Sequence, residues 1–124
     1  MRNMSFSMTT EAVRTRTKTV TRRIGWWDLK PGTLLCAVEK GMGLKKGEKV
    51  KRLAVIRVVS VKREDIWDVT KYPQEEMVRE GFPDLTTGGF WEMFIKANGW
   101  TRSCLLSHPV NRIEFEYVDG EVDG

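Results

Sequence analysis

Histidine and cysteine are scarce in this sequence of 124 residues, which contains one histidine, His108, and two cysteines, Cys36 and Cys104. A zinc site needs several such ligands at a characteristic spacing, and a Ser-His-Asp triad needs a suitably placed histidine. Neither pattern is present, and a phosphate-binding Walker loop is also missing. We therefore expect no metal and no cofactor, and we expect both cysteines to be buried thiols rather than a disulfide.

Long apolar runs are also missing, and none approaches the roughly 20 residues that a membrane-spanning helix needs. The first ten residues, MRNMSFSMTT, lack the apolar segment of a secretory signal. We therefore expect a cytoplasmic protein that is not associated with a membrane. A chain of 124 residues, 40% hydrophobic and 31% charged, can form one folded domain but not two. Residues 1–124 are predicted to be a single domain, with a disordered acidic tail over 119–124.

Acidic residues are absent between Arg14 and Trp27, a stretch that reads RTRTKTVTRRIGWW and carries five basic residues. By contrast, five acids and no base follow Arg112, so the chain before that point has nine more bases than acids, although its overall net charge is only +4. A clustered excess of positive charge favours a polyanionic partner such as RNA. It is also compatible with solubilising charge alone, but the bases cluster rather than spread, which favours the partner.

The spacing of apolar residues predicts a mixed α+β fold. Strands are expected over residues 5–8, 33–39, 50–61 and 110–118, and short helices over residues 10–16, 73–80 and 87–97. The segment 50–61 is almost continuously apolar, which predicts burial on both faces, with Arg57 reaching solvent from a sheet edge. Gly41–Gly47 is typical of a solvated hairpin loop. The order of elements favours a curled sheet or open barrel with helices at one end.

The basic stretch itself allows two conformations. Threonine at every second position favours an extended strand, in which Lys18 and Arg22 point to one face and Thr21 to the other. A turn after Lys18 would instead bring Lys18 and Thr21 to one place. The spacing of the residues does not decide between these conformations.

Five motifs, in this order, resemble the ASCH domain family, a branch of the PUA-like β-barrel folds. They are KTVTRR (Lys18–Arg23), KPG (Lys30–Gly32), REGF (Arg79–Phe82), FWEMF (Phe90–Phe94) and NRIEFEYV (Asn111–Val118). With their flanks they span residues 4–118, nearly the whole chain. The family often has a glycine where Thr17 stands here. The resemblance implies a PUA-like open β-barrel with a few short helices at one end, of the small solitary type found in bacteria and their phages.

The resemblance also implies two kinds of function. One is the binding of RNA or another nucleic acid in a cleft beside the barrel. The other comes from small bacterial members that resemble amidohydrolases and remove the acyl group from N4-acetylcytidine. Their catalytic residues correspond to Lys18, Thr21 and Glu80 in this sequence. In this assignment Thr21 is the nucleophile, neutral Lys18 is the base, and Glu80 orients the site and carries a proton to the leaving amine.

A lysine base of this kind requires a dry pocket, because the ordinary lysine pKa of about 10.4 must fall to roughly 7 to 8. Burial and neighbouring arginines lower the pKa of Lys18, whereas Glu80 raises it. Arginine meets phosphate and aromatic rings stack on bases. The residues predicted to bind the substrate or nucleic acid are therefore Arg16, Arg22, Arg23, Trp26, Trp27 and Phe82.

Other interpretations of the same residues stay open. Lys18 and Glu80 are also compatible with a structural ion pair, Thr21 with a strand filler, and one of the two adjacent tryptophans with the core. The alternative function is a binding module without catalysis. A phage protein that binds a host protein is a third, and an exposed apolar patch around Trp67 or Trp100 would be its sign. The sequence does not determine the oligomeric state.

Overall fold

A single five-stranded sheet with the strand order β1-β3-β4-β5-β2 organises the protein. The computed structural model describes residues 1–40 and 46–119. The strands are β1 (Arg2–Ser5), β2 (Val20–Arg23), β3 (Leu34–Val38), β4 (Arg52–Asp65) and β5 (Pro109–Tyr117). β1 and β3 are parallel, and the other neighbouring pairs are antiparallel. The predicted Gly41–Gly47 loop and acidic tail lie largely outside the described residues.

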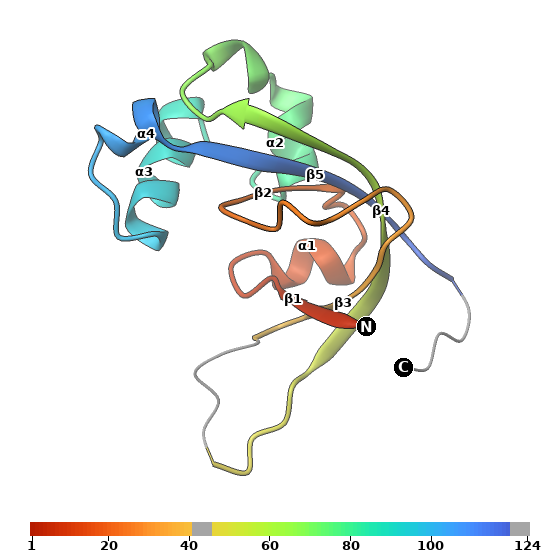
Figure 1. Ribbon diagram of the computed structural model, residues 1–124. Coiled ribbons are helices and arrows are strands. Elements are labelled where there is room, and N and C mark those ends of the chain that lie inside the picture. Colours follow the sequence, from red (N-terminus) through yellow and green to blue (C-terminus); the bar gives the residue numbers. More distant parts are fainter. Residues whose placement is uncertain (41–45, 120–124) are drawn as a thin grey trace.

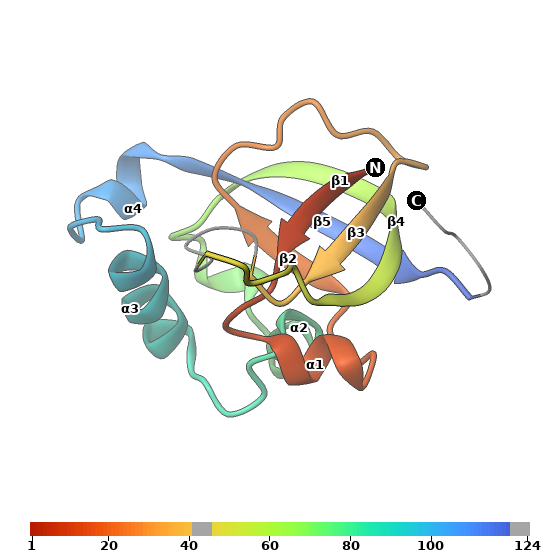
Figure 2. The same cartoon turned by 90° about the horizontal axis from the view of Figure 1, so that it is seen from below.

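The long strand β4 gives the sheet its curvature. Its register against β5 shifts between Val58 and Ser60, and a bulge of this kind bends a strand and increases its twist. Figure 2 shows β4 curving around the sheet, with β1 and β3 on one side and β5 and β2 on the other. The result is a half-closed barrel, which confirms the predicted α+β open barrel.

The helices that accompany this sheet are short. They are α1 (Thr10–Arg14), α2 (Gln74–Glu80), α3 (Thr87–Ala97) and α4 (Cys104–Ser107), together with a short 3-10 helix, η1 (Val69–Lys71). In Figure 1, α2, α3 and α4 gather at one end of the sheet, whereas α1 lies between β1 and β2. The predicted helix starts and ends are close to those observed. Thr86 caps α3 by accepting from the Gly89 amide, and Gly81 ends α2 with a left-handed backbone.

Two hydrophobic clusters form the core. The first lies inside the curled sheet and includes Phe6, Val13, Ile56 and Phe115. The second lies beneath the helices and consists of Ile66, Tyr72, Met77, Phe90, Phe94, Leu105 and Val110. The apolar stripe predicted for α3 therefore packs in the core, since Phe90 and Phe94 are both buried.

Three expectations need correction. The first strand covers residues 2–5 instead of 5–8, because Met4 pairs with Ala37 of β3 and the chain then turns towards α1. β4 is not buried on both faces, since Val59 and Arg57 are exposed on its outer side. Arg57 reaches solvent as expected, but from the middle of the sheet, where its guanidinium lies 3.1 Å from a Glu116 carboxylate oxygen on β5.

The cysteines and the helices bear on the remaining expectations. Cys36 is a buried free thiol, as expected, but the free thiol of Cys104 is only partly buried because it lies at the start of the peripheral helix α4. None of the helices in the described part of the chain combines the length and the apolar composition that spanning a membrane requires.

Candidate functional site

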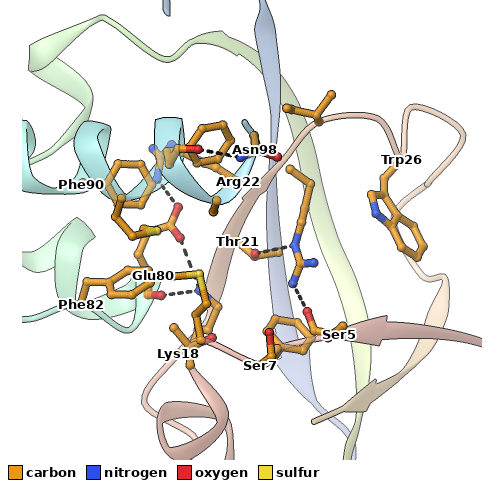
Figure 3. A pocket seen from close by; sticks show the side chains of 18 residues that line it. Ser5, Ser7, Lys18, Thr21, Arg22, Trp26, Glu80, Phe82, Phe90 and Asn98 are labelled. Atoms are coloured by element: carbon orange, nitrogen blue, oxygen red, sulfur yellow. Dashed lines mark hydrogen bonds and ion pairs between the residues drawn. The ribbon is translucent and has the colours of Figure 1, made fainter. Parts of the chain in front are cut away.

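A cavity of about 340 Å³ lies where the two hydrophobic clusters meet. One wall comes from the helical end and is formed by Phe82, Phe90, Met93 and Phe94. The opposite wall comes from the turns that flank β1 and β2, and includes Phe6 and Trp26. Figure 3 shows the polar side chains between these walls. A cavity that combines apolar walls with convergent polar groups is the usual form of a small-molecule site.

The basic stretch reaches this cavity through a turn at Thr15 and Arg16, before Lys18, whereas the predicted alternative to a strand had its turn after Lys18. The amides of Thr17 and Lys18 both donate to the Ala12 carbonyl at the end of α1, and Arg16 has a left-handed backbone with φ 60°. The strand β2 then covers only Val20–Arg23. An extended strand over the whole stretch is therefore wrong, and Lys18 and Thr21 both line the cavity.

Lys18 is deeply buried in the site, with 2% of its surface exposed. Its Nζ donates to the Glu80 backbone carbonyl, lies 3.3 Å from Glu80 Oε1, and approaches the rings of Phe6 and Phe82. Burial lowers the pKa of Lys18 to about 8, while Glu80 opposes this fall and the nearby arginines assist it. A fraction of Lys18 is therefore neutral near physiological pH.

Glu80 occupies the last position of α2, where the helix dipole disfavours an acid. It is nevertheless buried, because two cations hold its carboxylate: Lys18 at Oε1 and Arg22, whose Nη1 lies 2.7 Å from Oε2. Gly81, with φ 90°, lets the chain leave the helix at this point. The carboxylate of Glu80 is therefore held by Lys18 and Arg22 and is not solvated.

Arg22 is enclosed by acids from three positions. Its Nε lies 3.1 Å from Glu64 Oε1, its Nη1 bonds Glu80, and its Nη2 lies 2.7 Å from Glu76 Oε2 in an ion pair without hydrogen-bond geometry. Its guanidinium also covers the ring of Tyr72 at 4.8 Å. Burial by itself would lower the pKa of Arg22, but Glu80 and Glu64 outweigh it and raise the pKa above its ordinary value. All of its nitrogens are directed at protein groups and not at the cavity mouth.

The hydroxyl of Thr21 is bonded to the next arginine. Arg23 Nε donates to Thr21 Oγ1 at 2.9 Å, and its terminal nitrogen donates to the Ser5 carbonyl at 2.6 Å. Burial lowers the pKa of Arg23 to about 10, against the effect of Glu80. Among the described residues, no hydrogen bond joins Thr21 to Lys18, although both line the cavity. The side chain of Arg23 therefore fixes the threonine oxygen in place.

Two of the predicted binding residues lie away from the cavity lining. Arg16 is half exposed, bonds Asp119 and covers the Tyr117 ring. Trp27 is 49% exposed and lies beneath the guanidinium of Arg63. The lining does contain the other four predicted binding residues, Arg22, Arg23, Trp26 and Phe82.

Trp26 has a left-handed backbone with φ 59°, which is uncommon for a bulky residue. Its carbonyl accepts from the side-chain amide of the buried Asn111, and the guanidinium of Arg2 lies 4.3 Å from the centre of its ring. Strained backbone of this kind persists only where the surroundings hold it, and it concentrates at functional sites. The ring of Trp26 is thus a fixed part of the cavity wall.

Sequence reasoning missed two sets of residues. The acids Glu64 and Glu76, which enclose Arg22, gave no signal because one stands at the end of a strand and the other in the first turn of a helix. Met8 and Ile24, which line the cavity and are also exposed, were not recognised. Exposed apolar side chains in a cavity lining are a sign of a ligand site. This sign depends on the tertiary structure and is not visible in the sequence.

Metal ligands do not gather at this site. Within residues 1–40 and 46–119, no group of three or more His, Cys, Asp or Glu side chains is placed to hold a metal ion. The three acids Glu64, Glu76 and Glu80 instead converge on a guanidinium.

Sequence comparison finds no family model and no curated protein that matches this chain. Solved structures do match. Protein EF3133 from Enterococcus faecalis V583, assigned to the family model DUF984, has a TM-score of 0.62 at 17% identity, covering 99% of this chain and 83% of that one. The hypothetical protein PH0355 has a TM-score of 0.60 at 12% identity, covering 94% of this chain and 96% of that one. An ASCH domain from Lactobacillus crispatus JV V101 has a TM-score of 0.57 at 12% identity, covering 94% and 78%.

The chain has an ASCH-like fold. The expected PUA-like open barrel is thereby confirmed, at sequence identities too low to carry more than the fold. The motifs that resemble the ASCH family occupy defined places in it. KTVTRR forms the turn into β2 and β2 itself, REGF ends α2, and FWEMF lies within α3. Residues from these three motifs line the cavity, so the ASCH-like fold brings together segments that are far apart in the sequence.

Proposed function

We propose that this protein binds a modified nucleoside in the cavity and hydrolyses the amide bond of an acylated cytidine such as N4-acetylcytidine. The observation that carries the proposal is a buried lysine with a pKa of about 8 that lines a cavity together with a threonine hydroxyl and a glutamate. A base that is partly neutral near pH 7 is what this hydrolysis needs.

The chemistry assigns one role to each polar group. Thr21 Oγ1 attacks the acyl carbonyl carbon while Lys18 Nζ takes the hydroxyl proton. The tetrahedral intermediate then breaks its bond to the cytosine N4, which leaves with the proton that Lys18 returns. Water hydrolyses the acyl ester on Thr21, releasing the carboxylic acid and restoring the hydroxyl.

Glu80 and Arg23 support these steps. The Glu80 carboxylate and carbonyl hold Nζ of Lys18 in place and provide a route for the proton to the leaving amine. Arg23 donates its Nε proton to Thr21 Oγ1, so its positive charge stabilises the negative charge that develops on that oxygen. The rings of Phe82 and Trp26 form apolar walls suited to a flat base.

A nucleoside fits the cavity better than an RNA backbone does. The charged residues that line it, within the described part of the chain, are Lys18, Arg22, Arg23 and Glu80, and each is bonded to protein atoms. The exposed part of the lining includes the uncharged side chains Met8 and Ile24. RNA-binding surfaces instead present free arginines and lysines to phosphates.

Binding of RNA is the second candidate function, favoured by the exposed Trp27 and the guanidinium that covers it. An aromatic ring beside an arginine is a common platform for single-stranded nucleic acid. This function predicts an affinity for oligonucleotides that falls steeply with salt and is reduced by Trp27→Ala. Binding that is absent even at low salt would remove it.

The test of the hydrolase is to incubate the full chain with N4-acetylcytidine and to follow its conversion to cytidine. Thr21→Ala and Lys18→Ala are expected to reduce turnover by about 100-fold or more, because each removes a reacting group. Thr19→Ala is the matched control, since Thr19 is close in sequence but its hydroxyl accepts from Arg79, a residue outside the cavity lining. Undiminished turnover in Lys18→Ala would contradict the mechanism, and inactivity of the native chain would contradict the function.

A further inference from the structure

Glu80 is shared unequally between two cations. Its Oε2 lies 2.7 Å from Arg22 Nη1, whereas its Oε1 lies 3.3 Å from Lys18 Nζ. Arginine keeps its charge at all relevant pH values, but lysine can lose its proton. Arg22, which is closer and always charged, therefore compensates most of the negative charge of Glu80. The attraction between Glu80 and protonated Lys18 is correspondingly weaker.

Other acids hold Arg22 in this position. Glu64 of β4 bonds its Nε, Glu76 of α2 approaches its Nη2, and the Tyr72 ring lies against its guanidinium plane. Glu76 is in turn held by Arg112 through two bonds of 2.8 and 3.0 Å. With both terminal nitrogens and Nε engaged, the guanidinium cannot swing away from Glu80 without breaking several charged contacts.

The charges that face Lys18 and Glu80 come from every neighbouring element. The bases are Lys18, Arg22 and Arg23 around β2 and Arg112 of β5, and the acids are Glu64 of β4 and Glu76 and Glu80 of α2. Further out, Arg79 and Glu114 neutralise each other at 2.8 Å. The Tyr72 hydroxyl donates to the Ile66 carbonyl, and the segments before α1 and after α2 contribute the uncharged rings of Phe6 and Phe82.

This cluster of four bases and three acids has one excess positive charge when Lys18 is protonated. It is balanced when Lys18 is neutral. Uncompensated charge is unfavourable in a buried site, so the composition of the cluster favours loss of the lysine proton.

We propose that Arg22 is a positioning residue. Its ion pair with Glu80 weakens the attraction between that carboxylate and protonated Lys18, so that Lys18 can act as a neutral amine. The importance of Arg22 for catalysis rests on the proposed hydrolase. Its effect on the protonation of Lys18 is independent of that function and can be measured whether or not the protein is a hydrolase.

The experiment is an NMR titration of the Lys18 side chain in the full chain, with its signal assigned from a Lys18→Met variant. In Arg22→Met, the midpoint is expected to rise by about one unit or more, because Glu80 then acts on Lys18 alone and a nearby positive charge is lost. Arg22→Lys is expected to return the midpoint towards the native value. Arg57→Met is the matched control, since it removes an arginine that pairs with Glu116 outside this cluster, and should leave the midpoint unchanged.

A native midpoint in Arg22→Met would overturn the proposal. If that variant does not fold, Arg22→Met/Glu64→Gln removes the acid left unpaired at Nε and is expected to show a smaller rise, since Glu80 again acts on Lys18 alone. In an active protein, the rising limb of kcat/KM against pH should move with the titration, with a loss at pH 7 of about tenfold per unit. Inactivity of the native chain with a shifted midpoint refutes only the hydrolase, whereas activity with an unshifted midpoint refutes only the role of Arg22.

Discussion

The two halves of the basic stretch have similar compositions and opposite environments. Arg14 and Arg16 lie at the surface, about half exposed, and pair with Glu11 and Asp119. Lys18 and Arg22, a few residues later, are almost completely enclosed. The turn after α1 separates the two halves, and every acid that compensates the second half comes from α2 or β4.

This difference shows that the contribution of an ion pair to the free energy of unfolding depends on how deeply the pair is buried, and not on the charges alone. Exposed ion pairs contribute about 0 to 1 kcal/mol because water screens them. Breaking a buried pair leaves a charge without compensation and destabilises a protein by about 3 to 5 kcal/mol. The buried half also carries the pKa shifts of the candidate site, whereas the exposed half contributes none of the cavity lining.

The largest difference between the two halves is expected when one acidic partner of each half is removed. Glu80→Ala is expected to lower the free energy of unfolding by about 3 to 5 kcal/mol, because it leaves the buried Lys18 without its opposite charge and removes one of the acids that compensate Arg22. Asp119→Ala, which removes the partner of Arg16, should lower it by less than about 1 kcal/mol. Urea unfolding of both variants checks this, and similar losses would show that burial does not separate the two halves.

The protonation of Lys18 gives the second largest effect. Its folded pKa of about 8 lies below the ordinary 10.5, so the unfolded chain binds more protons between these values and stability should rise with pH there. The expected rise is about 3 kcal/mol relative to Lys18→Met, which lacks the group. Unfolding measured at several pH values in both proteins tests this, and parallel curves would contradict a depressed pKa.

Two glycines test how tightly α1 packs against the end of α2 beside the buried half. Gly81 and Gly32 both have φ near 90°, but a Cβ at Gly81 would lie 3.0 Å from a methyl of Thr9 and 3.1 Å from Ala12 Cβ, whereas at Gly32 it would meet open space. Gly32→Ala is expected to destabilise by about 1 kcal/mol and Gly81→Ala by about 2 to 3 kcal/mol, since only the second adds a clash to backbone strain. Thermal unfolding compares them, and equal losses would exclude a crowded junction between α1 and α2.

The smallest effect is expected on the outer face of β4. Arg57 and Glu116 pair at 3.1 Å on neighbouring strands, and both side chains are about half exposed. Arg57→Ala should change the free energy of unfolding by less than about 1 kcal/mol, and the change should shrink at high salt. A larger, salt-independent loss would mean that position in the sheet matters more than exposure to water.

Much of the fold follows from local patterns in the sequence. The alternation of Ile113 and Phe115 with charged residues marks β5, and Gly81 marks the end of α2. These features depend on backbone geometry and on one buried face, which neighbouring residues encode. The first strand and the burial of β4 were wrong because the choice of partner strand and the bulge at Val58 depend on distant residues.

The sequence predicted part of the cavity lining. Lys18, Thr21 and Glu80 came from the resemblance to the ASCH family, and all three line the cavity. The partners of Arg22 were not predictable, because nothing near them in the sequence distinguishes Glu64 or Glu76 from a solvated surface acid.

The sequence by itself determined which residues carry charge, where α2 and α3 end, and that an open barrel of this class would form. Only the tertiary structure decided that Arg22 is enclosed while Arg16 is exposed, and that Lys18 lies in a dry enough place to lower its pKa. Charge is a property of each residue, whereas desolvation and pairing depend on segments that folding brings together across more than 40 residues of chain.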